Sequence, residues 1–199
     1  MVLTGCRDLD IIITNYLDNN LIYGEGGSGK TTLSLLAAIE QLKNNKKILY
    51  LDSGENFSLE RFNQLSNNFK SEKLLVLKLK NFNDQHKKII ALENIKNVDL
   101  IIIDSITKYF RVLNRSEPEL ARAMLRKQLK IISNIKIPKI MTSEVFSNFR
   151  TIEPLSGELI KSFAQLILKL NKEPRNIILE KPNSKSMRFE IKNNGIFKI

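Results

Sequence analysis

The sequence is poor in the residues that build disulfides, metal clusters and membrane spans. Its 199 residues include one cysteine, Cys6, one histidine, His86, and no tryptophan. A lone cysteine excludes an internal disulfide and favours a reducing compartment, and it has no companion at the spacing of a metal site. No apolar run approaches the roughly 18 residues of a membrane span, and residues 1–10 show no secretory or transit signal. We therefore expect a soluble, cytoplasmic protein with neither a metal cluster nor a catalytic triad.

Acidic side chains are scarce relative to basic ones, and the imbalance lies in the second half. Residues 1–99 hold 13 basic and 12 acidic side chains, whereas residues 100–199 hold 19 and 9, and the net charge is +11. Such an excess attracts polyanions such as DNA or RNA, with binding that weakens as salt rises. A lysine- and asparagine-rich surface that only solvates the protein has the same composition, so charge alone leaves both interpretations open.

The sequence does contain a complete phosphate-binding motif. Gly24-Glu25-Gly26-Gly27-Ser28-Gly29-Lys30-Thr31 fits G-x-x-x-x-G-K-[ST] and stands between the apolar run 21–23 and a helical pattern that begins at Thr32. The glycines let successive backbone N–H groups turn inward around oxyanions, Lys30 can reach the outer phosphates, and the Thr31 hydroxyl can bind Mg²⁺. We expect residues 24–32 to hold ATP. The alternative is a chance glycine-rich turn, and the strand–loop–helix context argues against it.

A carboxylate ends a second apolar run. Residues 99–105 read Asp-Leu-Ile-Ile-Ile-Asp-Ser, so Asp104 arrives at the mouth of the sheet beside the phosphate loop. Asp104 is the candidate Mg²⁺ partner, acting through a water or through Thr31. The alternative is a strand-terminal aspartate that only caps the following turn.

Strand-like apolar runs alternate with helical patterns along most of the chain. This alternation predicts an α/β fold: one domain over residues 1–199, with a mostly parallel sheet covered by helices on both faces. The strands predicted in this part are 48–51, 74–79, 98–103 and 139–141, and the helices are 58–69, 84–95 and a long one from Pro118. The runs after these follow one another directly, so we expect antiparallel C-terminal strands: 166–170, 176–180, 187–191 and 196–199.

Four segments taken in order carry a family resemblance that covers nearly the whole chain. They are Thr4–Asp10, the phosphate loop, Tyr50–Phe62 and Asp104–Arg111. Together they resemble the RecA/RadA recombinase core, specifically its archaeal RadB-type paralogs. The resemblance implies a RecA-like P-loop ATPase core and an accessory protein of DNA recombination and repair that binds ATP, Mg²⁺ and DNA. A KaiC-like or helicase-like regulatory ATPase of the same superfamily is the alternative.

Two departures from the family pattern bear on hydrolysis. The carboxylate that orients the attacking water is displaced by one position in Ser53-Gly54-Glu55, although a loop can bring Glu55 back into reach. The block that senses the terminal phosphate reads Thr142-Ser143-Glu144-Val145, and the charge of Glu144 is expected to repel a phosphate. Both changes favour nucleotide binding with slow or absent hydrolysis. The candidate catalytic residues are Lys30 and Glu55.

The resemblance also places two DNA-binding loops, at roughly residues 110–118 and 146–156. Basic residues beside aromatic ones can neutralise phosphates while the rings stack on unpaired bases, so single-stranded DNA is favoured over double-stranded DNA. The candidates are Arg111, Arg115, Phe149 and Arg150. The cations of the helix from Pro118 are interpreted as a solvated face: Arg122, Arg126, Lys127 and Lys130.

Two kinds of function remain open at this point. One is a weak DNA-dependent ATPase. The other is a binding module in which ATP changes the affinity for DNA or for a recombinase and hydrolysis is incidental. The candidate partners are DNA, a recombinase or a Holliday-junction-processing protein, and further copies of the same chain.

Overall fold

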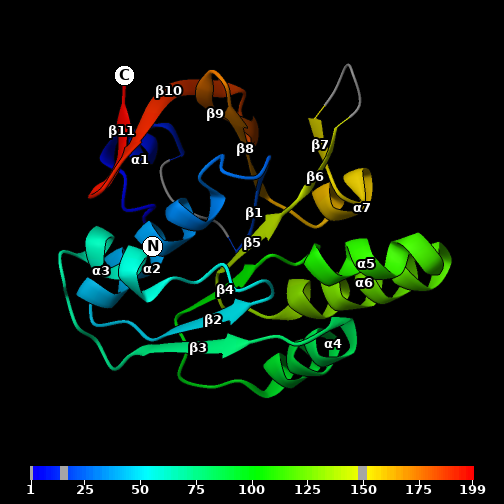
Figure 1. Ribbon diagram of the computed structural model, residues 1–199. Helices are drawn as coiled ribbons and strands as arrows, with labels where there is room; N and C mark the ends of the chain where they lie inside the picture. Colours follow the sequence, from blue (N-terminus) through cyan, green and yellow to red (C-terminus); the bar gives the residue numbers. More distant parts are fainter. Residues whose placement is uncertain (1, 14–17, 148–151) are drawn as a thin grey trace.

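The computed structural model describes residues 2–13, 18–147 and 152–199, and it is organised around one nine-stranded sheet (Figure 1). The strand order is β11-β10-β9-β8-β1-β5-β4-β2-β3, and β6 and β7 form a separate hairpin. The strands are β1 (Asn19–Gly24), β2 (Ile48–Asp52), β3 (Leu74–Lys78), β4 (Leu100–Asp104), β5 (Lys139–Ser143), β6 (Val145–Ser147), β7 (Ile152–Pro154), β8 (Leu166–Lys172), β9 (Arg175–Lys181), β10 (Lys185–Lys192) and β11 (Gly195–Lys198). The helices are α1 (Arg7–Ile13), α2 (Lys30–Lys43), α3 (Leu59–Ser66), α4 (Phe82–Ala91), the 3-10 turn η1 (Leu92–Asn94), α5 (Lys108–Ser116), α6 (Pro118–Asn134) and α7 (Gly157–Ser162).

The sheet is parallel in its first part and antiparallel in its last. Strands β8, β1, β5, β4, β2 and β3 pair in parallel, whereas β8 to β11 pair antiparallel in succession. The central strands β1, β2, β4 and β5 are buried at every position, as expected of parallel strands with both faces covered. The predicted fold class is therefore confirmed.

Two hydrophobic clusters fill the two faces of the sheet. Successive strand residues point to opposite faces, so Ile22 belongs to one cluster and its neighbours Leu21 and Tyr23 belong to the other. Helices α1, α2 and α3 cover the first cluster, and α4, α5, α6 and α7 cover the second (Figure 1). No helix in the described part of the chain is long and apolar enough to cross a membrane.

The segment predicted as the first DNA-binding loop is a helix instead. Residues 108–116 form α5, and α6 follows almost at once with Pro118 at its start. The reason lies in the spacing of its apolar residues, because Phe110 is buried in the second cluster and Tyr109 and Leu113 pack against that cluster. Arg111 and Arg115 therefore lie on a helix rather than at the tip of a loop.

The segment predicted as the second DNA-binding loop is a hairpin at its base. Strands β6 and β7 pair antiparallel from Val145 opposite Pro154 to Ser147 opposite Ile152. Figure 1 shows this hairpin projecting from the sheet next to α7. The candidates Phe149 and Arg150 fall outside the described residues.

We predict that the close approach of β1 and β8 at Gly24 tolerates no side chain. A Cβ at Gly24 would lie 2.2 Å from the backbone oxygen of Leu170 and 2.8 Å from Oγ of Ser28. Gly24→Ala should therefore destabilise the protein by roughly 1–3 kcal/mol through overpacking, which lowers the Tm by about 3–10 °C in a thermal melt. Gly26→Ala is the matched control, since a Cβ there meets nothing within 4 Å. Equal Tm values for the two nucleotide-free variants would contradict the packing argument.

Candidate functional site

A cavity of about 390 Å³ opens at the carboxyl ends of the parallel strands, where the phosphate loop meets β4 and β5. In open α/β sheets this edge is where ligands bind. The cavity is lined by Gly24, Glu25, Gly26, Gly27, Lys30, Thr31, Asn56, Asp104, Ser105, Arg111, Glu144 and Val145. The structure thus brings together most of the predicted phosphate loop and the predicted metal partner Asp104. Ser28, Gly29 and Thr32 adjoin the cavity in sequence but are not among its lining residues.

Lys30 is the first residue of α2, and its amine contacts the backbone of the phosphate loop. Nζ donates hydrogen bonds to the backbone oxygens of Gly24 and Glu25, each at 2.8 Å. Burial lowers the pKa of Lys30, although the nearby carboxylates of Asp104, Glu144 and Glu25 act in the opposite direction. An anion in the cavity would favour the protonated amine further, so the position of Lys30 suits a polyphosphate.

The loop itself is built to accept oxyanions. Gly27 and Gly29 have positive φ angles of 76° and 107°, and Gly29 directly precedes the first turn of α2. The Oγ of Ser28 is buried and has no hydrogen-bond partner within the described residues. A buried hydroxyl without a partner and the free N–H groups of a helix start are groups that phosphate oxygens satisfy.

Asp104 is the most tightly held polar group of the site. Asp104 is only 1% exposed, and its carboxylate accepts hydrogen bonds from the hydroxyls of Thr31 and Tyr50, each at 2.7 Å, and from the hydroxyl of Thr142. Burial, followed by the charge of Asp104, raises the pKa of Tyr50 well above its usual value, so that phenol remains a donor. These three donors come from α2, β2 and β5, and they fix the carboxylate at the edge of the cavity.

The oxygen atoms of Thr31 and Asp104 suit Mg²⁺. This ion prefers oxygen ligands and is commonly bound by one or two carboxylates together with substrate phosphates. No group of three or more His, Cys, Asp or Glu side chains within the described residues is arranged to hold a metal. One hydroxyl and one carboxylate are a donor set that fits an ion arriving with a polyphosphate.

Sequence reasoning missed the roles of Tyr50 and Thr142. Tyr50 lies inside the apolar strand β2, where a tyrosine reads as an ordinary core residue. In the structure Tyr50 pairs with Ile102, two residues before Asp104 at the end of β4. Only the three-dimensional structure shows that its hydroxyl reaches Asp104.

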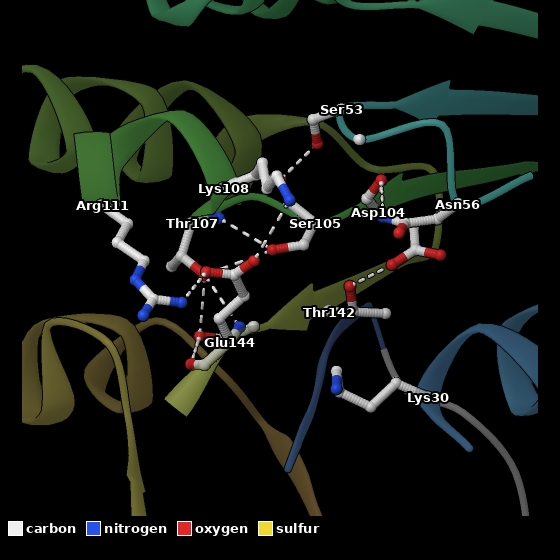
Figure 2. Close-up of polar contacts among 12 residues, drawn as sticks. Lys30, Ser53, Asn56, Asp104, Ser105, Thr107, Lys108, Arg111, Thr142 and Glu144 are labelled. Carbon is white, nitrogen blue, oxygen red and sulfur yellow. Dashed lines mark hydrogen bonds and ion pairs between the residues drawn. The ribbon is translucent and has the colours of Figure 1, made fainter. Parts of the chain in front are cut away.

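Glu144 does not stand as an isolated negative charge. Its carboxylate pairs with Nζ of Lys108 at 3.7 Å and with Nη1 of Arg111 at 3.2 Å, and both cations come from α5 (Figure 2). The expected repulsion of a phosphate by Glu144 stays a prediction, to which the structure adds the two cations. Two neighbouring cations offset the charge of Glu144.

Glu55 lies outside the cavity lining. It is exposed and has a positive φ of 56°, and the residue of its loop that lines the cavity is Asn56. The carboxylate of Asp52 holds this loop by accepting from the backbone N–H groups of Gly54 and Asn56, at 3.3 and 2.9 Å. The amide of Asn56 donates to the backbone oxygen of Asp104 at 3.3 Å (Figure 2). A water-orienting role for Glu55 would require this loop to rearrange.

The predicted DNA-binding residues are divided between two places. Arg111 lines the cavity, whereas Arg115 is exposed further along α5. A second cavity of about 540 Å³ lies between α5, α6, α7 and the β6–β7 hairpin. Arg122 and Arg126 line it together with Phe146, whose ring is 63% exposed. These two arginines, interpreted from sequence as a solvated face, thus stand beside an exposed aromatic ring.

Comparison with known proteins places the chain in a family. The profile of the Rad51 family matches residues 1–196. The chain belongs to the Rad51 family. It is 30% identical to the DNA repair and recombination protein RadB of Methanosphaera stadtmanae, over 87% of this chain and 84% of that protein. It is 31% identical to the protein of the same name from Thermoplasma volcanium, over 88% and 81% of the two chains.

A solved structure agrees with the fold described above. The crystal structure of the RadB recombinase aligns with a TM-score of 0.79 and 26% sequence identity, covering 100% of both chains. The RecA-like fold and the recombinase-paralog assignment expected from four short segments are therefore confirmed. These relatives do not support a KaiC-like or helicase-like role.

We predict that Asp104 makes nucleotide binding depend on Mg²⁺. Asp104→Asn keeps the shape of the side chain but removes the charge beside Thr31, so the Mg²⁺-dependent part of the affinity should fall about 10–100-fold. Calorimetry with ATP, with and without Mg²⁺, measures this part directly. Asp99→Asn, directly before the same strand, is the control, because Asp99 is partly exposed, pairs with Lys46 and lies outside the cavity lining. An Mg²⁺ dependence that is unchanged in Asp104→Asn would contradict the assignment.

Proposed function

We propose that this Rad51-family protein binds Mg²⁺-ATP in the cavity at the phosphate loop, and that it acts in DNA repair and recombination as an accessory protein rather than as a fast ATPase. One observation carries the proposal. The phosphate-loop amine of Lys30, the hydroxyl of Thr31 and the carboxylate of Asp104 meet in a single cavity. The relatives described above are named DNA repair and recombination proteins, which supports the biological setting.

Different residues of the cavity would bind the phosphates and the Mg²⁺ ion. The amine of Lys30 can exchange the backbone oxygens of Gly24 and Glu25 for phosphate oxygens, since charge-assisted hydrogen bonds are stronger than neutral ones. Thr31 and Asp104 would hold Mg²⁺, which neutralises phosphate charge when it is bound. The buried hydrogen bonds to Asp104 keep its carboxylate oriented for this role.

Of the three described carboxylates that line the cavity, two have partners and the third, Glu25, belongs to the phosphate loop itself. The lining carboxylates are Glu25, Asp104 and Glu144. Asp104 is engaged by three hydroxyls and Glu144 by two cations, and the loop after β2 contributes the neutral Asn56. This arrangement favours ATP as a ligand that changes the state of the protein, with slow turnover.

The groove between α6 and the β6–β7 hairpin is the surface we assign to single-stranded DNA. Arginines beside an exposed aromatic ring can neutralise phosphates and stack on bases, and Arg122, Arg126 and Phe146 have this combination. Glu153 and Glu158 also line the groove, but Glu153 pairs with Lys161 at 2.7 Å. Arg115, Phe149 and Arg150 remain candidates from the sequence alone. Further copies of the chain and a recombinase are the other partners that we propose.

The nucleotide part of the proposal is tested by calorimetry on the purified protein with ATP and ADP in the presence of Mg²⁺. Lys30→Ala should abolish measurable binding of both nucleotides. A wild-type protein that binds neither nucleotide would refute the proposed function.

We predict that Glu55 contributes little to turnover. Because its side chain is exposed outside the cavity lining, Glu55→Gln should change the slow rate of ATP hydrolysis by less than about threefold. The rate is measured by phosphate release with and without single-stranded DNA. A loss on the order of 100-fold or more would instead identify Glu55 as the general base.

We predict that Arg122 and Arg126 contribute to the salt dependence of DNA binding. The double variant Arg122→Gln/Arg126→Gln should weaken binding to single-stranded DNA, and the slope of log K against log salt should become shallower by about 1.4, near 0.7 for each lost phosphate contact. The matched control is Lys43→Gln/Lys47→Gln, which removes two exposed charges outside the groove. Equal slopes in the two double variants would exclude the groove as the DNA path.

A further inference from the structure

Two cations of α5 and the carboxylate of the residue after β5 meet at the edge of the nucleotide cavity. Lys108 and Arg111 lie one turn apart on α5, and both pair with Glu144, which follows β5 directly. Arg111 and Glu144 line the same cavity as Lys30 and Asp104. Figure 2 shows the side chains of Lys108 and Arg111 reaching toward Glu144 from the same helix. The pairing therefore belongs to the nucleotide cavity and not to a remote surface.

The ion pairs of Glu144 are weak enough to be exchanged. The side chains of Lys108 and Arg111 are 45% and 52% exposed, and exposed pairs of this kind contribute little to stability. A terminal phosphate carries a charge of about −1.5 to −2 and three acceptor oxygens, and it matches the fork of a guanidinium. A phosphate within reach would therefore compete successfully with the carboxylate for Arg111.

The backbone of Glu144 is fixed, so such an exchange needs only side-chain rotation. Its N–H donates to Oγ1 of Thr107 at 2.9 Å, and its backbone oxygen accepts from the N–H of Leu155 at 2.9 Å and from the hydroxyl of Ser143 at 2.7 Å. Glu144 is also close enough to Lys30 for its charge to act on the pKa of that amine. Because the lysine of a phosphate loop reaches the outer phosphates, Glu144 faces the outer end of a bound nucleotide.

We propose that Arg111, assisted by Lys108, is a ligand for the terminal phosphate of a nucleoside triphosphate, and that Glu144 holds these cations as an internal competing anion until the phosphate arrives. This inference rests on the proposed function and adds the means by which the site distinguishes a triphosphate from a diphosphate. It assigns Arg111 to the nucleotide and not to DNA. A diphosphate lacks the competing group, so Arg111 stays with Glu144.

The test is the selectivity of the site, defined as the Kd for ADP divided by the Kd for a non-hydrolysable ATP analogue, both with Mg²⁺ and measured by calorimetry. Arg111→Gln should lower this ratio about 10-fold or more, because a hydrogen bond to a charged group is lost only in the triphosphate complex. Arg111→Lys should recover part of the ratio, since lysine keeps the charge without the fork. Glu144→Gln should raise the ratio about threefold or more by removing the competitor.

Lys130→Gln is the charge control, because Lys130 is exposed on α6 and lies outside the cavity lining. It should leave the ratio unchanged. Thermal melts of each nucleotide-free variant identify any that fails to fold, and Arg111→Lys then serves as the conservative test.

An Arg111→Gln variant that loses affinity for ADP and the analogue equally, or for neither, would overturn the role of Arg111. An unchanged ratio in Glu144→Gln would overturn the role of Glu144. A wild-type protein that binds neither nucleotide would instead refute the proposed function.

Discussion

The buried carboxylate of Asp104 is the interaction on which the rest of the site depends. It ends β4, and it accepts hydroxyl hydrogen bonds from Thr31 on α2, Tyr50 on β2 and Thr142 on β5. A buried charge is costly unless it is hydrogen-bonded, so these donors make the position of the carboxylate possible. The same bonds tie the phosphate loop to the sheet. One side chain therefore joins three elements at the edge of the cavity.

Much of the fold could be predicted because each strand of the parallel part is a short, continuous apolar run. Such runs are typical of strands buried on both faces, and β1, β2, β4 and β5 are buried throughout. Helix α5 could not be placed in the same way. The family resemblance favoured a loop there, while Phe110, Tyr109 and Leu113 satisfy a helical spacing that became decisive only against the second cluster.

The part of the candidate site that comes from one contiguous motif could be predicted from the sequence. Contacts between residues far apart in the sequence could not. The phosphate loop is one contiguous motif, so Lys30 and Thr31 were identified directly. The pairing of Arg111 with Glu144 joins residues 33 positions apart, and it depends on α5 being a helix. Glu144 alone reads as a repulsive charge, and Arg111 alone reads as a DNA contact. Their meeting changes the interpretation of both.

Some of the excess basic side chains in the second half of the chain form hydrogen bonds and ion pairs within the protein. Arg175 of β9 donates to the backbone oxygen of Gly27 at 3.1 Å, and Lys161 of α7 pairs with Glu153 and Glu180. A glycine-rich loop is free to adopt many conformations, so the antiparallel strands that carry Arg175 supply a support that the loop lacks. Counting charges therefore overstates the surface available to DNA. At the groove, Arg122 and Arg126 form no ion pair among the described residues, so their charges are not offset by an internal acidic partner.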